Sequence, residues 1–223
     1  METNISVITN SISKKTIISI LIIIALISIS LKLYTTDFSN PINSDPLAYS
    51  LAAISHTNGD FSQSSHRGIG WSLIVSPFYY FIDSNNFLIY SNTIKIISLT
   101  ISIGTIFVVY LLGRKFFNEK YSLVVAALFA FEPHLNYNSG FGLSEPLYHL
   151  VLITAFYFLI NHKTKFFLPS LLLVGAAFWI RFEGIAFVII FIIIYCITKR
   201  NSPNFLRNLT IGILLFLLII APM

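Results

Sequence analysis

Four polar segments carry the residues that could do chemistry in a chain otherwise rich in Ile, Leu and Phe. They are NSDPLAYSLAAISH (43–56), HTNGDFSQSSHRGIGW (56–71), FEPHLNYNSGFGLSEPLYHL (131–150) and FWIRFEGIAF (178–187). Together they hold carboxylates, histidines and two arginines. Two or three converging carboxylates can hold Mg²⁺ or Mn²⁺, and a guanidinium matches the geometry of a phosphate. The sequence has no zinc-type ligand spacing, no P-loop and no nucleophile elbow.

The first segment predicts a short amphipathic helix over residues 45–57, lying on the membrane. At 100° per residue, Asp45, Tyr49 and His56 share one side of it, facing water or a cavity, opposite three aliphatic residues. The alternative for Asp45 is a helix N-cap, because Pro46 follows it. Tyr49 could equally anchor the helix at the interface, and His56 could be a surface histidine.

The other three segments leave similar alternatives open. His66 and Arg67 belong either to a site or to a solvated loop. Ionisable groups at a membrane boundary are functional candidates because they are costly there unless paired, solvated or used.

His134 and Glu145 are such boundary groups. Glu145 shares a helix face with His149, which permits a carboxylate–imidazole contact, or it caps the helix start. Arg181 either snorkels, pairs with an acid or binds a phosphate, and Glu183 lies two residues beyond it. Glu132, before Pro133, marks either a site or a helix break.

The elements that position these residues are predicted to be membrane helices. The chain is 56% hydrophobic and 10% charged, with a mean hydropathy of +0.80, which is typical of an integral membrane protein. Its net charge of +5 does not indicate nucleic-acid binding, because the Lys and Arg residues flank apolar runs. Seven runs approach the roughly 20 residues of a spanning helix. They are about 16–33, 89–113, 121–138, 144–161, 166–181, 184–198 and 205–222.

We therefore expect an all-α polytopic membrane protein with one transmembrane domain over residues 1–223. The first run could also be a signal peptide, but no small-residue cleavage pattern follows it. Residues 34–88 form a long loop, in which run 69–82 is too short to span and contains Pro77. We expect this run to be an interfacial or re-entrant helix.

The distribution of basic residues predicts a cytoplasmic N-terminus. Ten Lys and Arg residues then fall inside, and four lie outside or at outer helix ends: Lys32, Arg67, Lys95 and Arg181. Seven of the nine acids fall on the outer side: Asp37, Asp45, Asp60, Asp83, Glu132, Glu145 and Glu183. Because the polar candidates lie on that side, we expect the working face to be the outer one.

Four motifs in this order resemble the amino-terminal half of GT-C glycosyltransferases, near the protein O-mannosyltransferase and aminoarabinose-transferase group. They are SDPLAYSLAA, SHRGIGWSLIVSPFYYF, EPHLNYNSGFGLSEPLY and RFEG. The resemblance implies transfer of a sugar from a polyprenyl-phosphate carrier to an acceptor at the outer membrane face, with inversion at the anomeric carbon.

In that resemblance Asp45 corresponds to the catalytic base, and Glu145 would be a second acid that supports the acceptor or a metal. Arg67 and Arg181 would stabilise the departing phosphate, with His66 as a hydrogen-bond donor. A divalent cation, Mg²⁺ or Mn²⁺, is left open. Tyr49, His134 and Glu183 complete the substrate-binding candidates.

The sequence also departs from the family pattern. Gly68 stands where relatives usually have proline, and the chain covers about the first half of such an enzyme. We therefore expect a missing C-terminal portion, which a second chain could supply. The alternatives are a transporter or flippase component for a lipid-linked substrate and a non-catalytic membrane subunit. The near absence of ionisable groups in the cores of the spans disfavours transport.

Overall fold

The computed structural model describes residues 13–62, 68–82, 84–161 and 166–221, and its regular secondary structure in these ranges consists of helices joined by short connections. The helices are α1 (Lys14–Thr35), α2 (Ser44–Thr57), α3 (Gly70–Tyr79), α4 (Phe87–Gly113), α5 (Glu119–Phe131), α6 (Pro133–Phe141), α7 (Glu145–Leu159), α8 (Phe167–Ile180), α9 (Gly184–Lys199) and α10 (Phe205–Ile220). No strand occurs in the described part of the chain.

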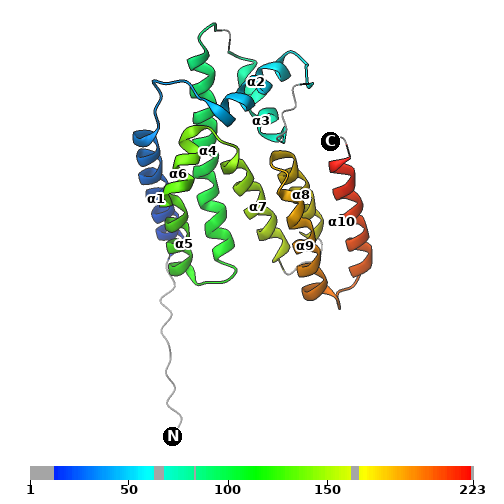
Figure 1. Cartoon of the computed structure of the whole chain (residues 1–223). Coiled ribbons are helices and arrows are strands. Elements are labelled where there is room, and N and C mark those ends of the chain that lie inside the picture. Colours follow the sequence, from blue (N-terminus) through cyan, green and yellow to red (C-terminus); the bar gives the residue numbers. More distant parts are fainter. Residues whose placement is uncertain (1–12, 63–67, 83, 162–165, 222–223) are drawn as a thin grey trace.

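The long helices run up and down between two ends of a bundle (Figure 1). At one end lie α2, α3, the start of α7 and the turn between α8 and α9; we call it the site end. The opposite end carries the start of α1, the α4–α5 and α9–α10 turns, the end of α7 and the start of α8, and we call it the basic end. Its described Lys and Arg residues are Lys14, Lys15, Arg114, Lys115, Lys120, Lys199, Arg200 and Arg207.

The helices differ in how well their lengths match a bilayer. Among the described residues, only α1 and α4, with 22 and 27 residues, are long and apolar enough to cross a membrane by length and composition. The apolar helices α7 to α10 have 14 to 16 residues. At about 1.5 Å per residue they fall short of the roughly 30 Å hydrocarbon layer. The expected runs are therefore helical, but α7, α8 and α10 are shorter than predicted, whereas α9 matches its predicted run to within one residue.

The third expected span, about 121–138, is wrong as one continuous helix. α5 ends at Phe131, and Glu132 adopts an extended conformation that begins α6. The Glu132 carboxylate accepts a hydrogen bond from the Leu135 backbone N–H at 2.5 Å, so Glu132 is the N-cap of α6. Pro133 occupies the first turn, where its missing N–H costs nothing. Of the two alternatives for Glu132, the structure supports the helix break.

Two buried lysines tie the site end together. Lys32 of α1 donates to Asn136 and, at 3.1 Å, to the Ser139 hydroxyl, both on α6. Lys95 of α4 donates to the Asp37 and Asn40 carbonyls at 2.5 and 2.8 Å. Both lysines, expected at outer helix ends, are thus buried and hold α6 and the 36–43 connection in place.

At the site end, α2 and α3 pack on the bundle through an apolar core that they share with α4, α7 and α8. Trp71 and Val75 of α3 are fully buried, as is Ala53 of α2. Leu51 on the opposite side of α2 is exposed. Since burying apolar surface is the main stabilising term, this core fixes α2 and α3 over the start of α7 and the end of α8.

Candidate functional site

A cavity of about 340 Å³ opens at the site end between α2 and the α8–α9 turn. Its lining comes from three separate parts of the chain: Asp45 and Tyr49; Gly68; and Ile180, Arg181, Phe182 and Glu183. Four of the predicted site residues therefore line one cavity. Such concave sites with a few converging polar groups are where small ligands usually bind.

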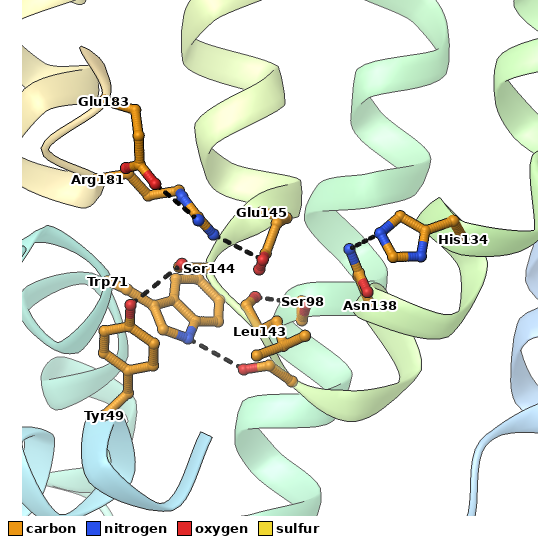
Figure 2. Close-up of polar contacts among 11 residues, drawn as sticks. Tyr49, Trp71, Ser98, His134, Asn138, Leu143, Ser144, Glu145, Arg181 and Glu183 are labelled. Atoms are coloured by element: carbon orange, nitrogen blue, oxygen red, sulfur yellow. Dashed lines mark hydrogen bonds and ion pairs between the residues drawn. The ribbon is translucent and has the colours of Figure 1, made fainter. Parts of the chain in front are cut away.

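Arg181 is the centre of the polar cluster in Figure 2. Its Nη1 atom lies 2.6 Å from Glu145 Oε1, and its Nη2 atom lies 3.1 Å from Glu183 Oε1. Arg181 thus joins the start of α7 to the α8–α9 turn. Of its three predicted roles, pairing with acids is present in this structure, and snorkelling is not needed to explain its position.

The electrostatics of this cluster follow from that pairing. Burial disfavours the charged guanidinium, but the hydrogen bonds and charges of Glu183 and Glu145 outweigh it and raise the pKa of Arg181. The hydrogen bond from Arg181 in turn lowers the pKa of Glu183. Both groups are therefore charged at neutral pH.

Glu145 is placed by the 142–144 loop just before α7 (Figure 2). Trp71 Nε1 donates to the Gly142 carbonyl at 3.1 Å, and the Ser98 hydroxyl donates to the Leu143 carbonyl at 3.2 Å. The Ser144 hydroxyl lies 3.4 Å from the Tyr49 hydroxyl, to which it donates. Tyr49, predicted as a substrate-binding residue, therefore also connects α2 to the residue that precedes Glu145.

The second carboxylate oxygen of Glu145, Oε2, is buried and has no hydrogen-bond partner among the described residues. Glu145 is the first residue of α7, and the N-cap is Ser144. The carboxylate–imidazole contact that the spacing permits is present as an electrostatic interaction between Glu145 and His149, and Glu145 Oε1 also accepts a hydrogen bond from Arg181. A buried carboxylate oxygen without a partner is costly and often marks a place where a ligand donates.

Asp45 is half-buried at the cavity wall, within the first turn of α2. The N-cap alternative for it is wrong, because α2 begins one residue earlier and Asn43 is its N-cap. Ser44 has a φ of 51°, in the left-handed region that is costly for a non-glycine residue. This sharp entry into α2 sets the direction of the first turn and hence of Asp45.

Gly68 lines the cavity, and Gly70 and Gly184 make close backbone contacts beside it; none of the three was predicted as a site residue. A Cβ atom at Gly68 would lie 2.2 Å from the Trp179 carbonyl oxygen, and one at Gly70 would lie 2.9 Å from it. A Cβ atom at Gly184 would lie 2.6 Å from the Phe178 backbone nitrogen. The start of α3 therefore contacts the end of α8 backbone to backbone. The sequence signal was Gly68, which replaces the usual proline.

His56 and His134 do not line the cavity. His56 is buried and stacks on Phe61 at 4.8 Å, and burial lowers its pKa although the nearby Ser72 backbone and Asp60 oppose the shift. The surface-histidine alternative for His56 is wrong. His134 is exposed on α6 and lies 3.4 Å from Asn138, outside the cavity lining. His66 and Arg67 lie outside the described residues.

Within the described ranges, no group of three or more His, Cys, Asp or Glu residues is arranged to hold a metal ion. The Mg²⁺ or Mn²⁺ expectation therefore gains no support from the described side chains. A larger cavity of about 640 Å³ lies between α1, α6 and the 36–43 connection, and it contains none of the predicted site residues.

A sequence model of the family described as dolichyl-phosphate-mannose-protein mannosyltransferase matches residues 77–223. This range is about two thirds of the chain. The chain belongs to this family. The match includes Glu145, Arg181 and Glu183 and begins after Asp45 and Tyr49. Among curated proteins, no sequence matches the chain significantly.

The fold of this family member is similar to that of an archaeal oligosaccharyltransferase. The crystal structure of the Archaeoglobus fulgidus oligosaccharyltransferase in the apo form aligns with a TM-score of 0.74 at 16% identity. The same organism's enzyme AglB, in complex with an inhibitory peptide and a dolichol-phosphate, aligns with a TM-score of 0.72 at 17% identity. Each alignment covers 94% of this chain and 29% of the other chain.

These findings confirm the predicted family resemblance and the all-α GT-C fold of an integral membrane protein. The family member spans less than a third of the length of the solved structures that it resembles. The roles of the individual site residues, and the side of the membrane that the site end faces, remain predictions.

Proposed function

We propose that this chain takes part in glycosyl transfer from a polyprenyl-phosphate-linked sugar to a hydroxyl acceptor at the outer membrane face. The observation that carries the proposal is the shared cavity of Asp45 and Arg181, a carboxylate and a guanidinium from distant parts of the chain. Membership of a family described by dolichyl-phosphate mannose and protein supports it, as does the dolichol-phosphate bound to the structurally similar AglB.

The proposed chemistry divides the roles between these two residues. Asp45 accepts the proton of the acceptor hydroxyl while that oxygen attacks the sugar C1 atom. The bond between C1 and the phosphate oxygen breaks, and the lipid phosphate leaves with the bonding electrons. Attack opposite the leaving group inverts the configuration at C1. Arg181 stabilises the charge on the departing phosphate, as preorganised donors do at developing negative charge.

The proposed orientation places the site end outside and the basic end in the cytoplasm. The concentration of Lys and Arg at the basic end supports this orientation, because cytoplasmic loops of membrane proteins carry an excess of these residues. The family description makes dolichyl-phosphate mannose and a protein hydroxyl the first donor and acceptor to test.

The test is transfer of labelled mannose from dolichyl-phosphate mannose in membranes that contain this chain. Asp45→Asn keeps the shape of the side chain and removes its basicity, so we expect transfer to fall about 10²–10⁴-fold at unchanged expression. The matched control is Asp60→Asn, an exposed aspartate of the same loop that accepts hydrogen bonds from Ser62 outside the cavity. Undiminished transfer by Asp45→Asn would exclude Asp45 as the base.

A further inference from the structure

The two acids that contact Arg181 differ strongly in their surroundings. The Glu145 side chain is 22% exposed, whereas the Glu183 side chain is 65% exposed. Glu145 begins α7 and follows the 142–144 loop. Trp71 and Ser98 bond to the backbone of this loop, and Tyr49 bonds to its Ser144 side chain. Glu183 precedes α9 in the turn that lines the cavity. The Nη1 atom of Arg181 is therefore held by the less exposed acid, and the Nη2 atom is held by the more exposed one.

The charges around the cavity do not favour an anionic ligand as they stand. Among the described residues of this cluster, Asp45, Glu145 and Glu183 supply three carboxylates, and Arg181 supplies the guanidinium. A phosphate that enters the cavity meets Arg181 with both terminal nitrogens already paired with carboxylates. A phosphate that binds at Nη1 or Nη2 therefore competes with the carboxylate already paired there.

The partner that can leave at low cost is Glu183. Exposed ion pairs contribute little to stability, because water solvates both charges after separation. Once released, the Glu183 carboxylate stays beside the start of α9, where the helix dipole favours a negative charge. Separating Glu145 from Arg181 would instead leave a half-buried carboxylate whose Oε2 atom already lacks a partner.

We propose that Glu183 occupies the phosphate-binding edge of Arg181 while the site is empty and competes with the phosphate of the lipid-linked substrate for it. Glu145 is a positioning residue that keeps the guanidinium aimed at the cavity in both states. The ligand class is a lipid phosphate ester, recognised through its phosphate oxygens by the Nη2 edge of Arg181. This inference rests on the proposed function, because it concerns the same cavity.

Glu183→Gln and Glu145→Gln each remove one negative charge, but we expect them to change the affinity for a lipid phosphate in opposite directions. Glu183→Gln removes the competitor and one negative charge, so we expect the Kd for a lipid phosphate to fall about three- to tenfold. Glu145→Gln loosens the guanidinium, so we expect the Kd to rise about tenfold. The matched control is Glu119→Gln, which removes the carboxylate of a Glu–Arg pair, 3.5 Å from Arg114, at the basic end. We expect no change in its Kd.

The measurement is binding of farnesyl phosphate to the purified full chain in detergent, with farnesol as the neutral probe. The proposal predicts that the Glu183→Gln gain appears with farnesyl phosphate and not with farnesol. It is overturned if Glu183→Gln binds the phosphate no tighter than the unmodified chain, if farnesol shows the same gain, or if no version binds the phosphate. Thermal unfolding of each variant checks folding; if Glu145→Gln does not fold, the Glu183→Gln result decides alone.

This outcome is separate from the test of the proposed function. Binding of farnesyl phosphate involves no sugar transfer and does not depend on Asp45 as a base. A chain that transfers no mannose but binds the phosphate more tightly after Glu183→Gln would contradict the proposed function and support the competition at Arg181. Mannose transfer that depends on Asp45, together with unchanged phosphate binding by Glu183→Gln, would support the proposed function and contradict the competition at Arg181.

Discussion

At the scale of single residues, the candidate site depends on groups that approach each other very closely. Arg181 bridges Glu145 and Glu183, and Gly68 lets the start of α3 touch the backbone of α8 next to Arg181. A side chain at position 68 would displace the wall that places Arg181 and Tyr49 around one cavity. The absence of a side chain at Gly68 is thus as much a part of the site as the charged groups.

We expect Gly68→Ala to destabilise the chain by about 1–3 kcal/mol, because its Cβ atom would overlap backbone that has no room to yield. Thermal unfolding in detergent measures this effect. The control is Gly104→Ala in α4, where an added Cβ atom meets nothing within 4 Å. That change should leave stability equal or slightly higher, since alanine favours a helix over glycine. Equal stabilities of the two variants would contradict the close contact at Gly68.

At the scale of helices, α3 positions the start of α7. The fully buried Trp71 donates its indole N–H to the Gly142 carbonyl and so holds the loop that ends at Glu145. A second indole, Trp179 of α8, donates to the Ile219 carbonyl of α10 at 2.8 Å. Both bonds join two helices, but only the first lies beside Glu145.

We expect Trp71→Phe to lower stability by about 1–3 kcal/mol, because a buried carbonyl loses its donor. Farnesyl phosphate binding should also weaken, because Glu145 then positions Arg181 less firmly. Trp179→Phe should cost similar stability and leave binding unchanged. Thermal unfolding and binding measured on both variants test this difference. A loss of binding in both variants, or in neither, would show that α3 does not act on the cluster through residues 142–144.

At the scale of the whole molecule, the candidate site and most of the basic turn residues lie at opposite ends of the bundle. The candidate polar cluster lies at the site end, and the described Lys and Arg residues of the turns, apart from Arg181, gather at the basic end (Figure 1). Because basic residues are retained on the cytoplasmic side, this separation predicts the sidedness of the cavity.

Introduced cysteines test this sidedness in a Cys196→Ser background, which removes the single native cysteine. We expect Ser39→Cys, exposed at the site end, to react in intact cells with a thiol reagent that cannot cross membranes. Asn201→Cys, exposed in the α9–α10 turn, should react only after the membrane is opened. The reverse labelling pattern would place the cavity in the cytoplasm and rule out the proposed orientation.

Local sequence patterns predicted much of the helical framework. The alternation of apolar runs with basic turns predicted a polytopic helical bundle, and the polar stripe of residues 45–57 predicted α2 almost to its ends. Pro133 indicated the break between α5 and α6 as an alternative to one long helix. These features follow from hydrophobic periodicity and from the missing N–H of proline, which act over a few residues. The exact ends of α7, α8 and α10 did not follow, because an apolar run does not by itself mark where its helix begins and ends.

The sequence by itself determined the membrane-helical class, the family resemblance and the residue types available for chemistry, because composition and short motifs are local properties. Only the tertiary structure decided which candidates meet: Asp45, Tyr49, Arg181 and Glu183 around one cavity, with Glu145 behind Arg181, and His134 apart from them. It also decided that His56 and the lysines at 32 and 95 are buried. The physical reason is that ion pairs and backbone contacts between residues 36 to 112 positions apart depend on how the helices pack.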